Sequence, residues 1–94
     1  MLQLLPQNTI LSPESYSPVE AIKFINSYID NYHCENLNVD ISFMNIIDAS
    51  YVSTMCSTKH FIKYPDGQIN WKVNSDIVKK FNKSFELCNC SYEV

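Results

Sequence analysis

The stretch Leu37-Asn-Val-Asp-Ile-Ser-Phe-Met-Asn-Ile-Ile-Asp48-Ala-Ser-Tyr-Val-Ser-Thr-Met-Cys-Ser-Thr58 decides the fold of this chain. Residues 37–43 alternate apolar and polar side chains, which predicts a β-strand with its apolar side chains on one face. From Val52 the apolar residues recur at intervals of three and four, which predicts a helix from about Ser50 to Tyr64. The polar turn Asp48-Ala49-Ser50 would then lie at the carboxyl end of the strand, where open α/β sheets carry functional groups.

The segments around this stretch add further elements. Residues 1–11 predict one or two short edge strands, and a helix is expected from about Pro18, because Ser17 and Glu20 match a capping box. Residues 64–67 match a turn. A strand is expected at 68–74, a helix at 75–88 and a short final strand at 90–94. This order predicts a small α/β domain over 1–94, with a four- to five-stranded, mostly parallel sheet and helices packed on one face.

Composition limits the classes of function. The chain has 94 residues, of which 46% are hydrophobic and 13% aromatic, enough for one packed core. The net charge is −3 and the pI about 5.1, so no basic surface for nucleic acid is expected. Residues 1–7 resemble neither a signal peptide nor a membrane span, and the even set of four cysteines fits no secreted framework. We therefore expect a cytoplasmic protein with reduced thiols.

The types and spacing of the residues give weak support to a metal site or a catalytic site. Cys56 and His60 are four residues apart, a spacing that suits two ligands on one helix face, and Cys88 lies near Cys90. Small buried thiols are the commoner explanation of such cysteines. The sequence lacks a glycine-rich phosphate loop and a nucleophile elbow. We expect a chain that is not an enzyme and binds no cofactor or metal.

A row of hydroxyl side chains follows Asp48 and is the candidate site. Asp48 or Ser50 could simply cap the helix while the other hydroxyls face solvent. Alternatively, Ser50 could accept a phosphate that the helix N-terminus stabilises and that changes partner binding. The candidate partner-binding residues are Asp48, Ser50, Tyr51, Ser53, Thr54, Ser57 and Thr58.

The predicted order of elements is an apolar strand followed by Asp48-Ala49-Ser50, a helix, the strand at Ile69-Asn-Trp-Lys-Val-Asn and a helix opened by Ser75. This order resembles the STAS domain of anti-sigma factor antagonists and sulfate transporters. The resemblance covers about residues 17 to 88. That family has Asp-Ser-Ser-Gly after its strand, and its second serine is phosphorylated in the sigma-regulating branch. Here Ala49 replaces the first serine, Ser50 matches the phosphoacceptor and Tyr51 replaces the glycine.

The resemblance implies a non-enzymatic cytoplasmic regulatory module, similar to an anti-sigma factor antagonist, that binds another protein. Its partner would be an anti-sigma kinase, and phosphorylation of Ser50 would release it. The alternatives are a constitutive accessory or scaffold subunit, as on transporter ATPases, and a small inhibitor encoded by a phage or mobile element. A small enzyme or metal protein is a further alternative. The oligomeric state is left open by the sequence.

Overall fold

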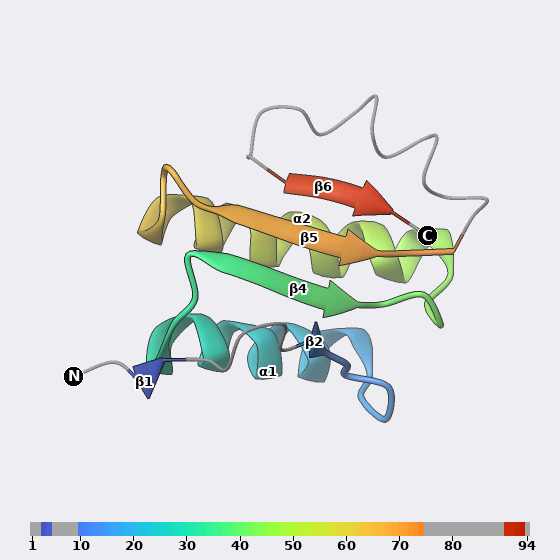
Figure 1. The fold of residues 1–94 in the computed structure, drawn as a ribbon. Helices are drawn as coiled ribbons and strands as arrows, with labels where there is room; N and C mark the ends of the chain where they lie inside the picture. The colour runs from blue at the N-terminus through green and yellow to red at the C-terminus, as the bar shows by residue number, and fades with distance from the viewer. Residues whose placement is uncertain (1–2, 5–9, 75–89, 94) are drawn as a thin grey trace.

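A parallel sheet lies against two helices in the structure, a computed structural model that describes residues 3–4, 10–74 and 90–93 (Figure 1). Both of these helices cover the same face of the sheet, behind the strands in this view. The described elements are β1 (Gln3–Leu4), β2 (Ile10–Leu11), α1 (Pro18–Asn31), β3 (Tyr32–His33), β4 (Asn36–Asp40), α2 (Ile46–Lys63), β5 (Gln68–Lys72) and β6 (Cys90–Glu93).

The main sheet has four strands in the order β2-β4-β5-β6, and every neighbouring pair is parallel. β1 and β3 form a separate two-stranded parallel ladder. The predicted α/β class, with a four-stranded parallel sheet, is confirmed. A parallel pair needs a crossover connection, and α1 and α2 supply it between β2 and β4 and between β4 and β5.

The two faces of the sheet differ in chemistry because successive side chains of a strand point to opposite sides. On the face toward the helices, Leu37 pairs with Ile69 and Val39 with Trp71, and all four side chains are buried. On the other face, the amides form a ladder in which Gln68 donates to Asn70 at 3.1 Å and Asn70 donates to Asn38 at 3.0 Å. The sheet therefore has one core face and one polar face.

β4 is shorter than the predicted strand over 37–43. Its last residue is Asp40, whose carboxylate accepts the main-chain N–H of Ser42 at 3.0 Å and its hydroxyl at 2.7 Å. This local turn diverts the chain from the sheet. Ile41 is still buried, but Phe43 is 41% exposed and does not belong to the core face.

α1 begins where the sequence predicts. Ser17 accepts the N–H of Glu20 at 3.3 Å, the Glu20 carboxylate accepts the N–H of Ser17 at 3.3 Å, and Pro18 occupies the first turn. Its buried stripe is Ala21, Ile25 and Ile29. The capping box thus fixes the direction in which α1 leaves the loop after β2.

The turn between α2 and β5 requires glycine because of close packing. The N–H of Gly67 donates to the carbonyl of Tyr64 at 2.9 Å, as expected for the predicted turn. A Cβ on Gly67 would fall 2.9 Å from the Cβ of Tyr64 and inside van der Waals contact of the Glu35 carbonyl. The loop before β4 and the turn before β5 are therefore packed directly against each other.

The helix predicted over 75–88 lies outside the described residues, and the predicted final strand is present as β6. No helix in the described part of the chain is both long enough and apolar enough to cross a membrane.

Candidate functional site

α2 begins one turn earlier than the sequence predicts. The side chain of Asn45 caps it by accepting the N–H of Asp48 at 2.8 Å, so Asp48-Ala49-Ser50 is not a turn but part of the helix. The prediction missed Asn45, although asparagine is a strong N-cap residue. Ser50 lies half-buried beyond the free N–H groups of the first turn, so the helix N-terminus no longer explains why a phosphate should bind there.

The predicted hydroxyl row is divided between two sides of α2. Ser53 and Ser57 are buried: the phenol of Tyr92 donates to Ser53 Oγ at 3.1 Å, and the indole of Trp71 donates to Ser57 Oγ at 2.8 Å. Ser53 and Ser57, which were predicted to belong to the binding surface, are therefore not at the surface of the folded chain.

The remaining hydroxyls stay on the exposed side. Thr54 and Thr58 are exposed, and the Thr58 hydroxyl donates to the carbonyl of Thr54 at 2.8 Å. Tyr51 is 47% exposed, and Asp48 is partly exposed. The structure therefore keeps Tyr51, Thr54 and Thr58 together on the outer face of α2.

Large apolar side chains dominate this outer face. They recur at intervals of four, four and seven residues, which places them on one line along the helix. The four residues are Ile47, Tyr51, Met55 and Ile62, and their side chains are 77, 47, 49 and 74% exposed, respectively. We call these four residues the α2 stripe. In the sequence, Met55 and Ile62 follow the same intervals of three and four as Val52 and Cys56, which are buried. The exposed and the buried apolar residues of α2 both have helical spacing, but only the buried ones pack in the core.

A groove of about 420 Å³ lies beside the stripe, between α2 and α1. Met55 and Ile62 form part of its wall, and Asn26 of α1 contributes the opposite side. The Oδ1 atom of Asn26 is buried and has no hydrogen-bond partner among the residues that the structure describes. Asn26 therefore lies at the junction of the two helices.

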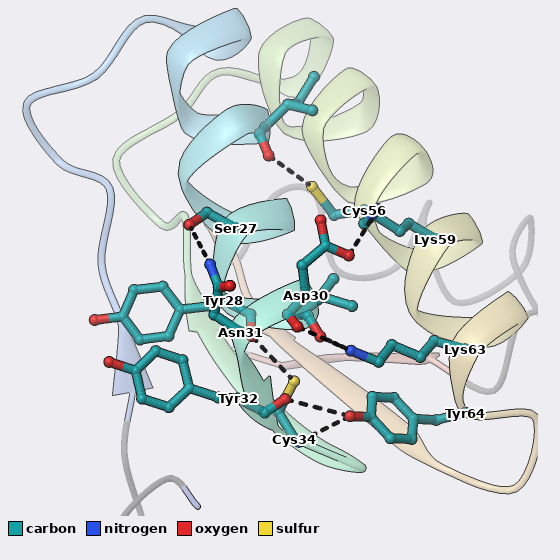
Figure 2. Close-up of polar contacts among 12 residues, drawn as sticks. Ser27, Tyr28, Asp30, Asn31, Tyr32, Cys34, Cys56, Lys59, Lys63 and Tyr64 are labelled. Atoms are coloured by element: carbon teal, nitrogen blue, oxygen red, sulfur yellow. Dashed lines mark hydrogen bonds and ion pairs between the residues drawn. The ribbon is translucent and has the colours of Figure 1, made fainter. Parts of the chain in front are cut away.

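Three residues of the groove lining, Asp30, Lys59 and Lys63, make contacts between α2 and the last turn of α1 (Figure 2). Lys63 of α2 donates to the carbonyls of Ile29 and Asp30, the second at 3.3 Å, and Lys59 pairs with the Asp30 carboxylate at 3.1 Å. α1 has no basic residue in its own last turn, so Lys63 supplies the positive charge that a helix C-terminus favours. These contacts fix α2 against α1.

The cysteine and histidine pair on α2 belongs to the core. Cys56 is buried with its thiol 4.0 Å from the carbonyl of Ile22, and burial raises its pKa to about 12, partly opposed by Lys59. His60 is buried with Nε2 2.8 Å from the carbonyl of Cys34. Within residues 3–4, 10–74 and 90–93, no three His, Cys, Asp or Glu side chains are placed to hold a metal ion. A thiol with so high a pKa is a poor ligand and a poor nucleophile.

Comparison of the chain with protein-family models, with curated proteins and with solved structures finds no match. The resemblance to STAS domains stays a prediction.

Proposed function

We propose that this chain is a non-enzymatic protein-binding module whose partner docks on the outer face of α2. The observation that supports the proposal is the α2 stripe, four large apolar side chains exposed in one line on a helix whose opposite side already fills the core. Contiguous apolar surface on a folded protein commonly marks an interaction site. Burying it would contribute about 25 cal/mol for each Å² of apolar area.

The groove beside the stripe supports the same proposal. Side chains of a partner could enter it between α2 and α1, and the contacts of Lys59 and Lys63 with α1 hold its two walls in place before binding. A preformed surface loses less conformational entropy on binding than a mobile one. The docking face is therefore built from two helices that already contact each other in the unbound chain.

The resemblance to STAS domains would make this module a regulatory protein. Its partner would then be an anti-sigma kinase or a transporter ATPase. The proposal itself depends only on the α2 stripe. Of the predicted site, Tyr51, Thr54 and Thr58 are exposed, and Asp48 and Ser50 are partly exposed.

Affinity capture from the organism that makes the protein tests this function. The bait would be the wild-type chain, a Tyr51→Ser/Ile62→Ser double variant and an Ile10→Ser control, because Ile10 is 60% exposed but lies on the edge strand β2. We expect the same protein to be captured by the wild type and by the control, and its recovery to fall at least about tenfold with the double variant. Equal recovery with all three baits would contradict the proposal.

A further inference from the structure

We infer that the occupant of the α2 stripe is a second copy of this chain, with the two α2 helices packed antiparallel about a two-fold axis. This inference rests on the proposed function, since it names the partner at the same surface. It is drawn from two features of α2: the spacing of its exposed apolar residues and the position of its charges.

The exposed residues are symmetric about the middle of the helix. Under a two-fold axis that passes between Thr54 and Met55, Ile47 lies opposite Ile62 of the second copy, and Tyr51 lies opposite Thr58. Ile47 and Ile62, the most exposed residues of the stripe at 77 and 74%, would cover each other at both ends of the contact. They are separated by about 22 Å along the helix, at 1.5 Å per residue. A two-fold interface needs such a self-complementary surface.

The charges of α2 also match in this arrangement. Asp48 lies in the first turn, and Lys59 and Lys63 lie in the last two turns. Both lysines line the groove beside Met55 and Ile62, at the border of the outer face, where they also contact Asp30 and the end of α1. Asp48 is eleven residues before Lys59, three turns along the same side. Antiparallel packing brings the acidic end of each helix to the basic end of the other, and it also opposes the two helix dipoles. A parallel arrangement would place like charges together.

Thr58 and Thr54 fit the centre of the same contact. Both are exposed, and the Thr58 hydroxyl is already hydrogen-bonded to the carbonyl of Thr54, so burial would not leave it unpaired. The middle of the interface therefore combines Met55 with short side chains that let two helices approach closely.

Two charge variants, separately and mixed, test the pairing of Ile47 with Ile62. The mass in solution is measured by light scattering for the wild type, for Ile47→Lys, for Ile62→Glu, for an equimolar mixture of these two variants and for an Ile10→Lys control. The wild type and the control are expected at twice the chain mass of 10.9 kDa. Each stripe variant alone buries an unpaired charge in the interface, which should raise the dissociation constant at least about tenfold.

The mixture decides the register. One end of a mixed dimer joins the introduced lysine to the introduced glutamate, and the other end keeps both native isoleucines, so the dimer is expected to return. A mixture that stays at one chain mass, a wild type at one chain mass, or variants that dimerise like the wild type would each overturn the inference. If the wild type is monomeric but the affinity capture still depends on the stripe, only the second copy is excluded and the proposed function stands.

Discussion

His60 is a buried histidine whose ring is held by the main chain. The carbonyl of Cys34 can only accept a hydrogen bond, so Nε2, 2.8 Å away, must carry the proton. Burial lowers the pKa of His60, an effect opposed by the carbonyls of Cys34 and Glu35 and by the charge of Glu35. The folded state therefore holds a neutral ring at a pH where the unfolded chain already takes up a proton.

This pKa shift predicts a loss of stability in weak acid. Below the unfolded-state pKa of about 6.5 the unfolded chain binds more protons than the folded chain, so the free energy of unfolding should fall as the pH decreases, until the lowered folded-state pKa is reached. Urea titrations at several pH values between neutrality and the onset of carboxylate protonation measure this slope. His60→Gln should flatten it, and the exposed His33→Gln serves as the control. An unchanged slope in His60→Gln would contradict the account.

The hydrogen bond between Trp71 and Ser57 predicts a second effect on stability. Ser57→Ala leaves the buried indole N–H without its acceptor and should lower the free energy of unfolding by about 1–3 kcal/mol. Trp71 is the single tryptophan of the chain, so its fluorescence reports the unfolding transition directly in urea. Thr58→Ala, next to it but on the exposed side of α2, is the matched control and should change stability by less than about 0.5 kcal/mol.

At the scale of elements, the sequence predicted those features that depend on neighbouring residues. The capping box of α1 needs only Ser17 and Glu20, and the turn before β5 needs only residues 64–67. The start of α2 was misplaced because Asn45, Asp48 and Ser50 are all residue types that favour helix starts. Nothing in the local pattern distinguishes these three residues. In the structure β4 ends at Asp40, and Asn45 is the residue that caps α2.

The sequence also could not predict which hydroxyl residues of α2 are buried and which are exposed, because this depends on contacts with distant parts of the chain. Ser53 and Ser57 are buried because their partners, Tyr92 and Trp71, come from β6 and β5, which are distant in the chain. A buried serine and an exposed one follow the same helical period. Only the tertiary contacts decide which side of α2 faces the sheet, and they leave Tyr51, Thr54 and Thr58 outside.

The contact of Lys63 with the end of α1 predicts the effect of removing its charge. Lys63→Met keeps most of the aliphatic chain but leaves the carbonyls of Ile29 and Asp30 without this donor. We expect a loss of about 1 kcal/mol in the free energy of unfolding, because the charge at the helix C-terminus is lost as well. Thermal unfolding of the variant beside Lys72→Met, an exposed lysine on β5, measures the difference. Equal stability of the two variants would show that Lys63 does not cap α1.

Ser50 offers a test of the phosphorylation expected from the STAS resemblance. Because Ser50 lies in the second turn of α2, half-buried, Ser50→Ala and Ser50→Asp are both expected to keep partner binding within about threefold, which is less than about 0.7 kcal/mol. Affinity capture with each variant as bait measures this. If Ser50→Asp alone lost the partner, a switch at Ser50 would be favoured over constitutive docking.

At the scale of the whole molecule, the two outer faces differ. On the polar face of the sheet, side-chain hydrogen bonds join Gln68 to Asn70 and Asn70 to Asn38. The outer face of the helix layer carries the α2 stripe. Large apolar side chains that are left exposed add nothing to the stability of the domain itself. The asymmetry of the two faces is the reason to place the interaction surface on α2.

Photo-crosslinking in the living host tests this claim most directly. A photoreactive amino acid would replace Met55, in the middle of the α2 stripe, or Lys72, which is exposed and belongs to β5. The account predicts a discrete crosslinked protein, either another protein or a second copy, from position 55 and none from position 72. Crosslinks of equal yield at both positions, or from position 72 alone, would contradict it.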